Sequence, residues 1–122
     1  NNAFSSVAME AAFREGEEWL EQMLDYVSGN FDFIADYCKN RIPKIRPSMP
    51  DATYLVWLDC RELGLDDAAL KEFMIKKAKL GLNPGSSFTR GLSGFMRLNA
   101  ACPRSVLKKA MEQLEEAVNG LE

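Results

Sequence analysis

Residues 95–120 read FMRLNAACPRSVLKKAMEQLEEAVNG, a strand pattern followed directly by an amphipathic-helix pattern. The first part, Phe95 to Ala101, is mostly apolar, which predicts a strand. Pro103 suits the first position of a helix, where a missing N–H group costs nothing. Apolar residues then recur on one face of that helix up to Gly120, namely Val106, Leu107, Ala110, Met111, Leu114 and Ala117.

A second strand and a second helix precede this unit. The segment Thr53–Leu58 is β-branched and aromatic without polar alternation, which predicts a strand covered on both faces. Asp66 is a suitable N-cap for the helix that follows, and Gly81 is its expected C-cap. The apolar stripe of this helix comprises Leu70, Phe73, Met74 and Ala78. Upstream of the strand, prolines 43, 47 and 50 predict an irregular connector.

Residues 82–94 connect the second helix to the final strand. Leu82 and Asn83 predict a short strand that runs into the turn signal Pro84-Gly85. The stretch from Ser86 to Gly94 is rich in Gly, Ser and Thr and predicts a loop.

The N-terminal third predicts two helices. The first covers about residues 5–13, and Gly16 separates it from the second. The second helix begins at Glu17, and its apolar residues step by four and three: Leu20, Leu24, Val27, Phe31, Ile34, Cys38 and Ile42. This stripe continues through the turn-like triplet 28–30, so one helix is expected to end before Pro43. Its length is on the order of 39 Å at 1.5 Å per residue.

The order of elements predicts an α/β domain over residues 1–122. A small, mostly antiparallel sheet is expected to pack against helices, within a sheet-and-helix core at residues 43–122. Residues 1–42 form the helices of a long N-terminal arm. A helix of this length usually lies along a domain boundary, so it is expected to be an interdomain helix.

Composition excludes several classes of function. The chain is 47% hydrophobic and 27% charged, with a formal net charge of −3, which is typical of a soluble protein without a nucleic-acid-binding surface. The longest apolar run, Tyr54 to Leu58, is too short to cross a membrane, and no signal peptide pattern is present. Three widely spaced cysteines predict free thiols in a reducing cytoplasm. The absence of histidine excludes Ser-His and Cys-His nucleophiles.

Arg97 is the residue that most favours a binding site. It lies within the apolar final strand, where a charge is costly unless it meets an anion or several acceptors. A guanidinium binds a carboxylate through two parallel hydrogen bonds, which lysine cannot reproduce. Two structural alternatives stay open: an ion pair with an acidic residue, or an edge strand with Arg97 in water.

The segment 83–88, NPGSSF, is a weaker candidate. Its backbone amides and hydroxyl groups, with Asn83, Gly85 and Ser86 foremost, are able to line a ligand site at a tight turn. An ordinary turn between two strands explains the same residues.

Four segments together resemble the MalY/PatB-type carbon–sulfur lyases, a group of pyridoxal 5′-phosphate (PLP) enzymes of aminotransferase fold. Residues 95–105 resemble the family's closing motif, in which a strand carries the arginine that binds the substrate α-carboxylate. Residues 53–59, TYLVWLD, resemble its "GTYLxWLD" strand, although Ala52 replaces the glycine. Residues 82–88 resemble its glycine-serine loop, and residues 11–20 its "AAxxEGxxWL" helix entry.

The resemblance implies that the chain is the C-terminal small domain of such an enzyme, without the large PLP-binding domain. It assigns the substrate α-carboxylate to Arg97 and a lesser role beside the substrate to Asn83, Gly85 and Ser86. It implies PLP in the full-length enzyme, and none on these residues, because none of the lysines stands in the family's PLP-lysine motif. The expected parent is a cytoplasmic homodimer that splits cystathionine or cysteine-type amino acids into thiol, pyruvate and ammonia.

Two alternatives remain open for function. One is the small domain of a PLP-dependent aminotransferase, since the residues that separate the two reactions are expected outside this segment. The other is a free-standing α/β interaction module without PLP. The chain alone is expected to be inactive, and to self-associate through exposed helix faces before about Val27.

Overall fold

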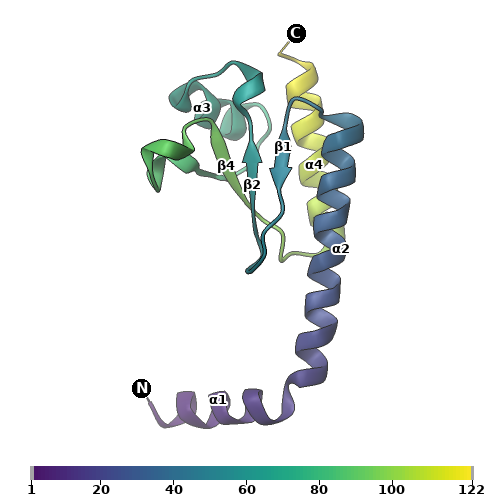
Figure 1. Ribbon diagram of the computed structural model, residues 1–122, viewed down its shortest axis with the longest axis vertical. Coiled ribbons are helices and arrows are strands. Elements are labelled where there is room, and N and C mark those ends of the chain that lie inside the picture. Colours follow the sequence, from purple (N-terminus) through teal and green to yellow (C-terminus); the bar gives the residue numbers. More distant parts are fainter. Residues whose placement is uncertain (1, 122) are drawn as a thin grey trace.

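The computed structural model describes residues 2–121. In chain order its elements are α1 (Ala3–Glu15), α2 (Glu17–Arg41), β1 (Arg46–Ser48), β2 (Leu55–Asp59), α3 (Asp67–Lys76), β3 (Asn83–Pro84), β4 (Phe95–Asn99) and α4 (Arg104–Asn119), with short 3-10 helices at Arg61–Leu63, Gly85–Ser87 and Arg90–Leu92. Figure 1 shows α2 running along one side of the sheet beside α4. Helix α1 projects from the N-terminal end of α2, away from the sheet.

The four strands form one antiparallel sheet in the order β1-β2-β4-β3. The predicted small antiparallel sheet is therefore confirmed, and the arrangement is α+β. In this register the Cα of Arg97 lies opposite Trp57 on one side and opposite Asn83 on the other. Residues directly opposite one another project from the same face of a sheet, so these three side chains share one face.

Only one face of the sheet is buried. Along β2 and β4 the residues Val56, Leu58, Met96 and Leu98 are buried, and their neighbours in sequence are half-buried or exposed. The buried side chains share one core with apolar residues of α2, α3 and α4. The prediction that β2 is covered on both faces is wrong, because all three helices contribute to the same core. The other face carries the large aromatic side chains of Trp57 and Phe95. Because these residues are apolar, the sequence does not show the alternation of apolar and polar residues expected of a strand with one exposed face.

The long helix is confirmed as one uninterrupted element from Glu17 to Arg41. The turn-like triplet lies inside it, and the buried side chain of Asn30 explains why a polar residue interrupts the stripe. Helix α1 is longer than predicted because the Asn2 side chain accepts a hydrogen bond from the Ser5 N–H group at 2.8 Å. Between the two helices, a Cβ atom at Gly16 would lie 2.4 Å from the Ala12 carbonyl oxygen, so this junction requires glycine.

Three local expectations are corrected. The connector contains strand β1 at its Arg46–Ser48 segment; Pro47 is tolerated there because β1 is at the edge of the sheet. Helix α3 ends at Lys76 with Lys77 as C-cap, so Gly81 is not its cap. The expected loop of residues 86–94 contains two single-turn 3-10 helices.

Two smaller points concern backbone conformation. Pro103 precedes the first helical residue of α4 as its N-cap. Ala52, which replaces a glycine of the family pattern, does not have a positive φ; the neighbouring Thr53 does, at 72°. Loss of that glycine is therefore compatible with the turn before β2.

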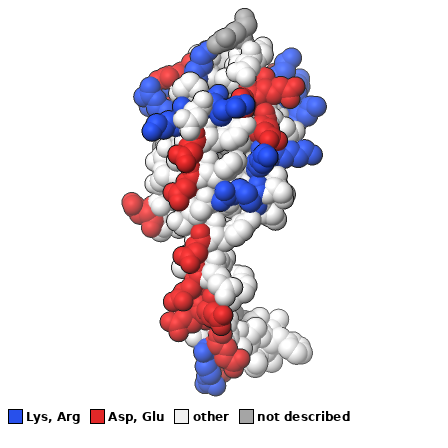
Figure 2. Space-filling model, turned by 90° about the vertical axis from the view of Figure 1, so that its right-hand side faces the viewer, with Lys and Arg blue, Asp and Glu red and all other residues white. Residues whose placement is uncertain are grey.

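Two regions differ in burial. We call residues 3–26 the stem and residues 27–121 the head. Every residue of α1 is exposed, and the stem exposes large apolar side chains, including Phe4, Val7, Phe13, Trp19, Leu20 and Leu24. The predicted exposure of an apolar strip before Val27 is confirmed for Phe4, Val7, Leu20 and Leu24. The stem is also acidic, with Glu10, Glu15, Glu17, Glu18, Glu21 and Asp25 against the single basic residue Arg14; Figure 2 shows acidic side chains following it.

Among residues 2–121, no helix is both long and apolar enough to span a membrane.

Candidate functional site

The half-covered face of the sheet brings the predicted site residues together. Arg97 lies near the middle of β4, with Trp57 of β2 and Asn83 of β3 beside it. Phe88, from the segment between β3 and β4, covers the guanidinium: the Arg97 Cζ lies 4.4 Å from the centre of its ring. Trp57 meets Phe88 edge-on, with ring centres 5.6 Å apart at 87°.

Arg97 lacks a polar partner within the described chain. Its Nε atom is buried and has no hydrogen-bond partner, and no ion pair joins the guanidinium to an acidic residue of that part. The alternative of a structural ion pair is therefore wrong within these residues. An unpartnered buried N–H group destabilises a protein by about 1–3 kcal/mol. Such a group is well suited to an anion that arrives from outside.

The segment 83–88 divides into an exposed part beside Arg97 and a buried structural part. Asn83 is exposed, directly across from Arg97, and Ser86 is exposed in the 3-10 turn. Gly85 is buried, and a Cβ atom there would lie 2.3 Å from the Leu92 carbonyl oxygen. Glycine is therefore required at position 85 for close packing of the loop. The Ser87 hydroxyl donates to the Pro84 carbonyl at 2.6 Å and closes the turn.

A groove of about 500 Å³ adjoins Arg97 where the short β3 leaves the edge of β4. Polar residues Asn83, Arg97 and Asn99 lie along it, opposite apolar residues of α4. A concave surface with one cation and a few amide groups suits a small anionic molecule.

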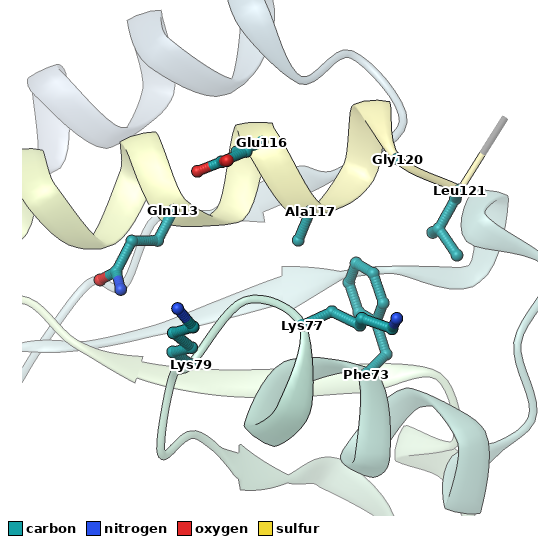
Figure 3. A pocket seen from close by; sticks show the side chains of 8 residues that line it. All are labelled: Phe73, Lys77, Lys79, Gln113, Glu116, Ala117, Gly120 and Leu121. Carbon is teal, nitrogen blue, oxygen red and sulfur yellow. The ribbon is translucent and has the colours of Figure 1, made fainter.

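The other cavities offer less. Figure 3 shows a depression between α3 and α4, whose lining includes Lys77, Lys79 and Glu116. Its volume is about 300 Å³. Its charged side chains extend from exposed residues. No group of three or more potential metal-binding side chains occurs among the residues described.

The cysteines do not form a reactive site. All three are free, and burial raises the pKa of the Cys38 and Cys60 thiols to about 12. Burial also raises the pKa of Cys102. Since the thiolate is the nucleophile, this burial disfavours the reactive form of the three thiols.

Phe88 lies within the predicted candidate segment 83–88 but was given no role of its own there, and Asn30 was not singled out. Phe88 is half-exposed and resembles any loop aromatic in the sequence, so its stacking on Arg97 had no signal beyond its place in the loop motif. Asn30 is fully buried in α2; its Nδ2 donates to the carbonyl oxygens of Ala100 (2.7 Å) and Cys102 (3.0 Å), just after β4. Arg104 Nε donates to its Oδ1 at 2.7 Å. The isolated polar residue in the α2 stripe was the available signal.

No family model matches the sequence. Individual proteins do. The chain is 38% identical over 118 residues to cystathionine β-lyase PatB of Bacillus subtilis, and this alignment covers 97% of the chain and 30% of PatB.

Two solved structures share the fold. A PLP-bound aminotransferase candidate from Clostridium difficile 630 has a TM-score of 0.94 and 44% identity, covering 98% of this chain and 31% of that protein. Cystalysin from Treponema denticola, which contains PLP, has a TM-score of 0.96 and 32% identity, covering 99% of this chain and 31% of cystalysin. The chain thus spans less than a third of these proteins, and it is related to them over nearly all of its own length.

Proposed function

We propose that this chain, a homologue of the PLP-dependent carbon–sulfur lyases of aminotransferase fold, forms the small C-terminal domain of such an enzyme. Its role is to bind the α-carboxylate of an amino-acid substrate through Arg97. The observation that carries this proposal is the buried Nε atom of Arg97, which lacks a hydrogen-bond partner beside an open groove.

The residues present suit the substrate better than the cofactor. Arg97 offers in-plane N–H donors, and Asn83 offers an amide directly across the strand pair. All eight lysines are exposed on helices or loops, at positions 39, 44, 71, 76, 77, 79, 108 and 109. None lies in an enclosed pocket suited to a covalently held cofactor, so we assign PLP attachment to residues outside these 122.

Arg97 contributes orientation. A bidentate pair with Arg97 fixes the plane of the substrate carboxylate. It thereby positions the attached α-carbon relative to the reacting groups of the large domain. Movement of the small domain onto the bound substrate would exclude water from the closed site. PLP, when bound by the rest of the enzyme, supplies the electron sink for the substrate's α-carbon.

We propose a β-thioether amino acid such as cystathionine as the substrate, with thiol, pyruvate and ammonia as products. The similarity to PatB and to related cystathionine β-lyases supports this substrate class. The alternative is aminotransfer, which is favoured by the 44% identity to the Clostridium difficile protein. Product analysis with L-cystathionine, for pyruvate and thiol against a keto acid retaining the thioether, separates the two.

Substitution of Arg97 in the full-length enzyme tests the carboxylate role. Arg97→Ala is expected to lower kcat/KM by about 10²–10⁴, because a charged contact in a closed site contributes about 3–5 kcal/mol. Arg97→Lys should recover only part of the loss, since a point charge cannot reproduce the planar fork. Absorption of bound PLP and the melting temperature serve as controls.

A strongly destabilised Arg97→Ala variant with near-normal activity per folded molecule would contradict the proposal. Independently, the 122-residue chain alone is expected neither to attach PLP covalently nor to turn over amino acids. Borohydride reduction of the chain mixed with PLP, followed by mass spectrometry, checks this. A stoichiometric adduct at one lysine would contradict it and favour a cofactor site within the chain.

A further inference from the structure

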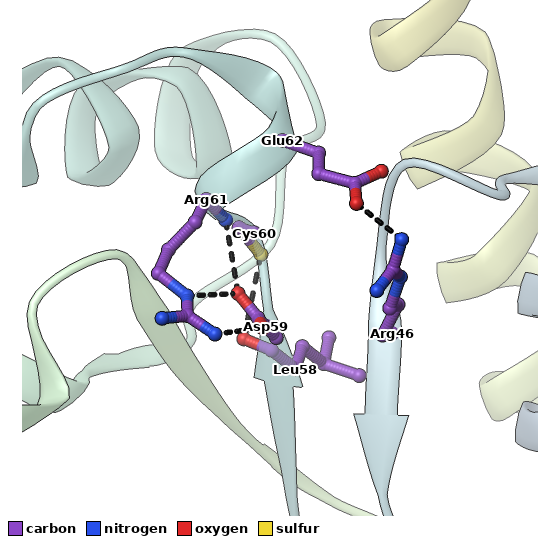
Figure 4. Close-up of polar contacts among 6 residues, drawn as sticks. All are labelled: Arg46, Leu58, Asp59, Cys60, Arg61 and Glu62. Carbon is purple, nitrogen blue, oxygen red and sulfur yellow. Dashed lines mark hydrogen bonds and ion pairs between the residues drawn. The ribbon is translucent and has the colours of Figure 1, made fainter.

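Three arginines of the head stack on aromatic rings, and two of them also have polar partners. Arg61 Cζ lies 5.0 Å from the Phe95 ring centre, and its Nε and Nη2 donate to Asp59 at 2.9 and 2.7 Å. Figure 4 shows this ion pair beside the end of β2. Arg104 Cζ lies 4.9 Å from the ring centre of Phe33, and its Nε donates to Asn30.

Arg97 differs from the other two in lacking a polar partner within residues 2–121. Its stack on Phe88 is the shortest of the three, at 4.4 Å. A stacked ring occupies the flat face of a guanidinium and leaves the N–H donors at its edge free. An acidic partner such as Asp59 would instead use those donors. The Phe88 stack therefore holds the arginine in place while keeping its carboxylate-binding edge available.

The surroundings of Phe88 limit its movement. The Trp57 and Phe88 rings pack nearly perpendicular to each other, and the Phe88 N–H group donates to the Gly85 carbonyl oxygen at 2.9 Å. Gly85 is itself buried against Leu92, where no side chain fits. The ring thus stands on a closed turn and is supported by a neighbouring strand.

We infer that Phe88 is a positioning residue: it pre-orients Arg97 for the substrate carboxylate, and Trp57 holds its ring. The inference rests on the proposed function of Arg97. It assigns to the loop of residues 85–92 a role in carboxylate affinity that acts through Arg97 and needs no direct contact with the reacting atoms.

Kinetics of the full-length enzyme with L-cystathionine test this role. Removing the stack in Phe88→Leu should raise KM by about three- to tenfold, with kcat changed by less than about twofold. Phe88→Tyr keeps the ring and should restore the wild-type KM. The matched control is Phe95→Leu, which removes the ring beneath Arg61 on the same sheet face and should leave KM within about twofold.

A second measurement separates positioning from general packing. In the 122-residue chain, the NMR order parameter of the Arg97 Nε–H bond should fall in Phe88→Leu, while that of Arg61 stays unchanged. Phe95→Leu should show the reverse. Equal order parameters and an unchanged KM in Phe88→Leu would overturn the inference while leaving the role of Arg97 intact. If Arg97→Ala itself leaves KM and kcat/KM unchanged, the proposed function fails, and the inference falls with it.

Discussion

The stem and the head contain parts of the same helix in opposite environments. In α2, Leu24 is 55% exposed, whereas Ile34, less than three turns further on, is fully buried in the core. Both are large aliphatic residues of one continuous stripe. Helical hydrogen bonds satisfy the backbone in both places, so the difference lies only in what the side chains contact.

This difference shows that a periodic apolar stripe predicts that a helix face is buried in a contact. The periodicity does not identify the domain or molecule that makes the contact. The head buries its stripe against its own sheet. The stem keeps apolar side chains exposed, with Phe13 at 88% and Trp19 at 69%. Large exposed patches of this kind are typical of interaction surfaces. In the parent enzyme we propose that the large domain covers them.

The sharpest test of the comparison is a pair of truncations on α2. Ile34→Ala should lower the free energy of unfolding by about 2–5 kcal/mol, because it leaves a cavity in the core. Leu24→Ala, the matched exposed position, should change it by less than about 0.5 kcal/mol. Urea denaturation of the 122-residue chain measures both. Similar losses for the two variants would mean that the stem is packed in solution.

Asn30 marks the junction where α2 meets the end of β4. Asn30→Ala should destabilise the chain by about 1–3 kcal/mol, because the carbonyl groups of Ala100 and Cys102 and the Arg104 side chain lose their buried partner. Asn40→Ala, at an exposed position of the same helix, should stay within about 0.5 kcal/mol of wild type. Equal unfolding midpoints for both variants would show that the Asn30 network adds nothing to stability.

At the C-terminal end of α2, Glu115 of α4 contacts Tyr37 and Arg41. Hydrogen bonds from Tyr37 (2.6 Å) and Arg41 (2.9 Å) lower the pKa of the Glu115 carboxyl group. A lowered folded-state pKa adds stability above the unfolded value of about 4.3, and this is lost as pH falls through the folded value.

The stability difference between wild type and Glu115→Gln should therefore be present at pH 7 and shrink in acid. Glu112→Gln, at an exposed ion pair with Lys108 on the same helix, is the control. Urea midpoints measured from pH 7 down to strongly acidic pH give the comparison. If the stability difference between wild type and Glu115→Gln does not change with pH, the charge of Glu115 is not its cause.

The smallest expected effect on stability belongs to the stem. Deleting residues 1–15 should shift the melting temperature of the head by less than about 2 °C, because no residue of α1 is buried. The same deletion should reduce self-association, which we expect through the exposed apolar strip. Sedimentation velocity of both chains measures this. If the undeleted 122-residue chain stays monomeric at high concentration, the expected association is contradicted.

Local features of the fold were predictable where residues interact with near neighbours. The helix start at Asp66 follows from its side chain, which accepts a hydrogen bond from the Ala69 N–H group at 2.8 Å. The unbroken course of α2 follows from its apolar phase. Strand β1 was missed because three residues with a central proline carry no local strand signal. The segment is a strand only because it pairs with β2.

The candidate site divides in the same way. By itself, the sequence determined that Arg97 sits in an apolar strand and within a motif that resembles one enzyme family. Only the tertiary structure decided that Phe88 lies over the guanidinium, that Asn83 lies opposite, and that no acidic residue of the described chain pairs with Arg97. The physical reason is that strand and helix patterns arise from neighbours within a few positions. The partners of a charged side chain come from segments that only the folded core brings together.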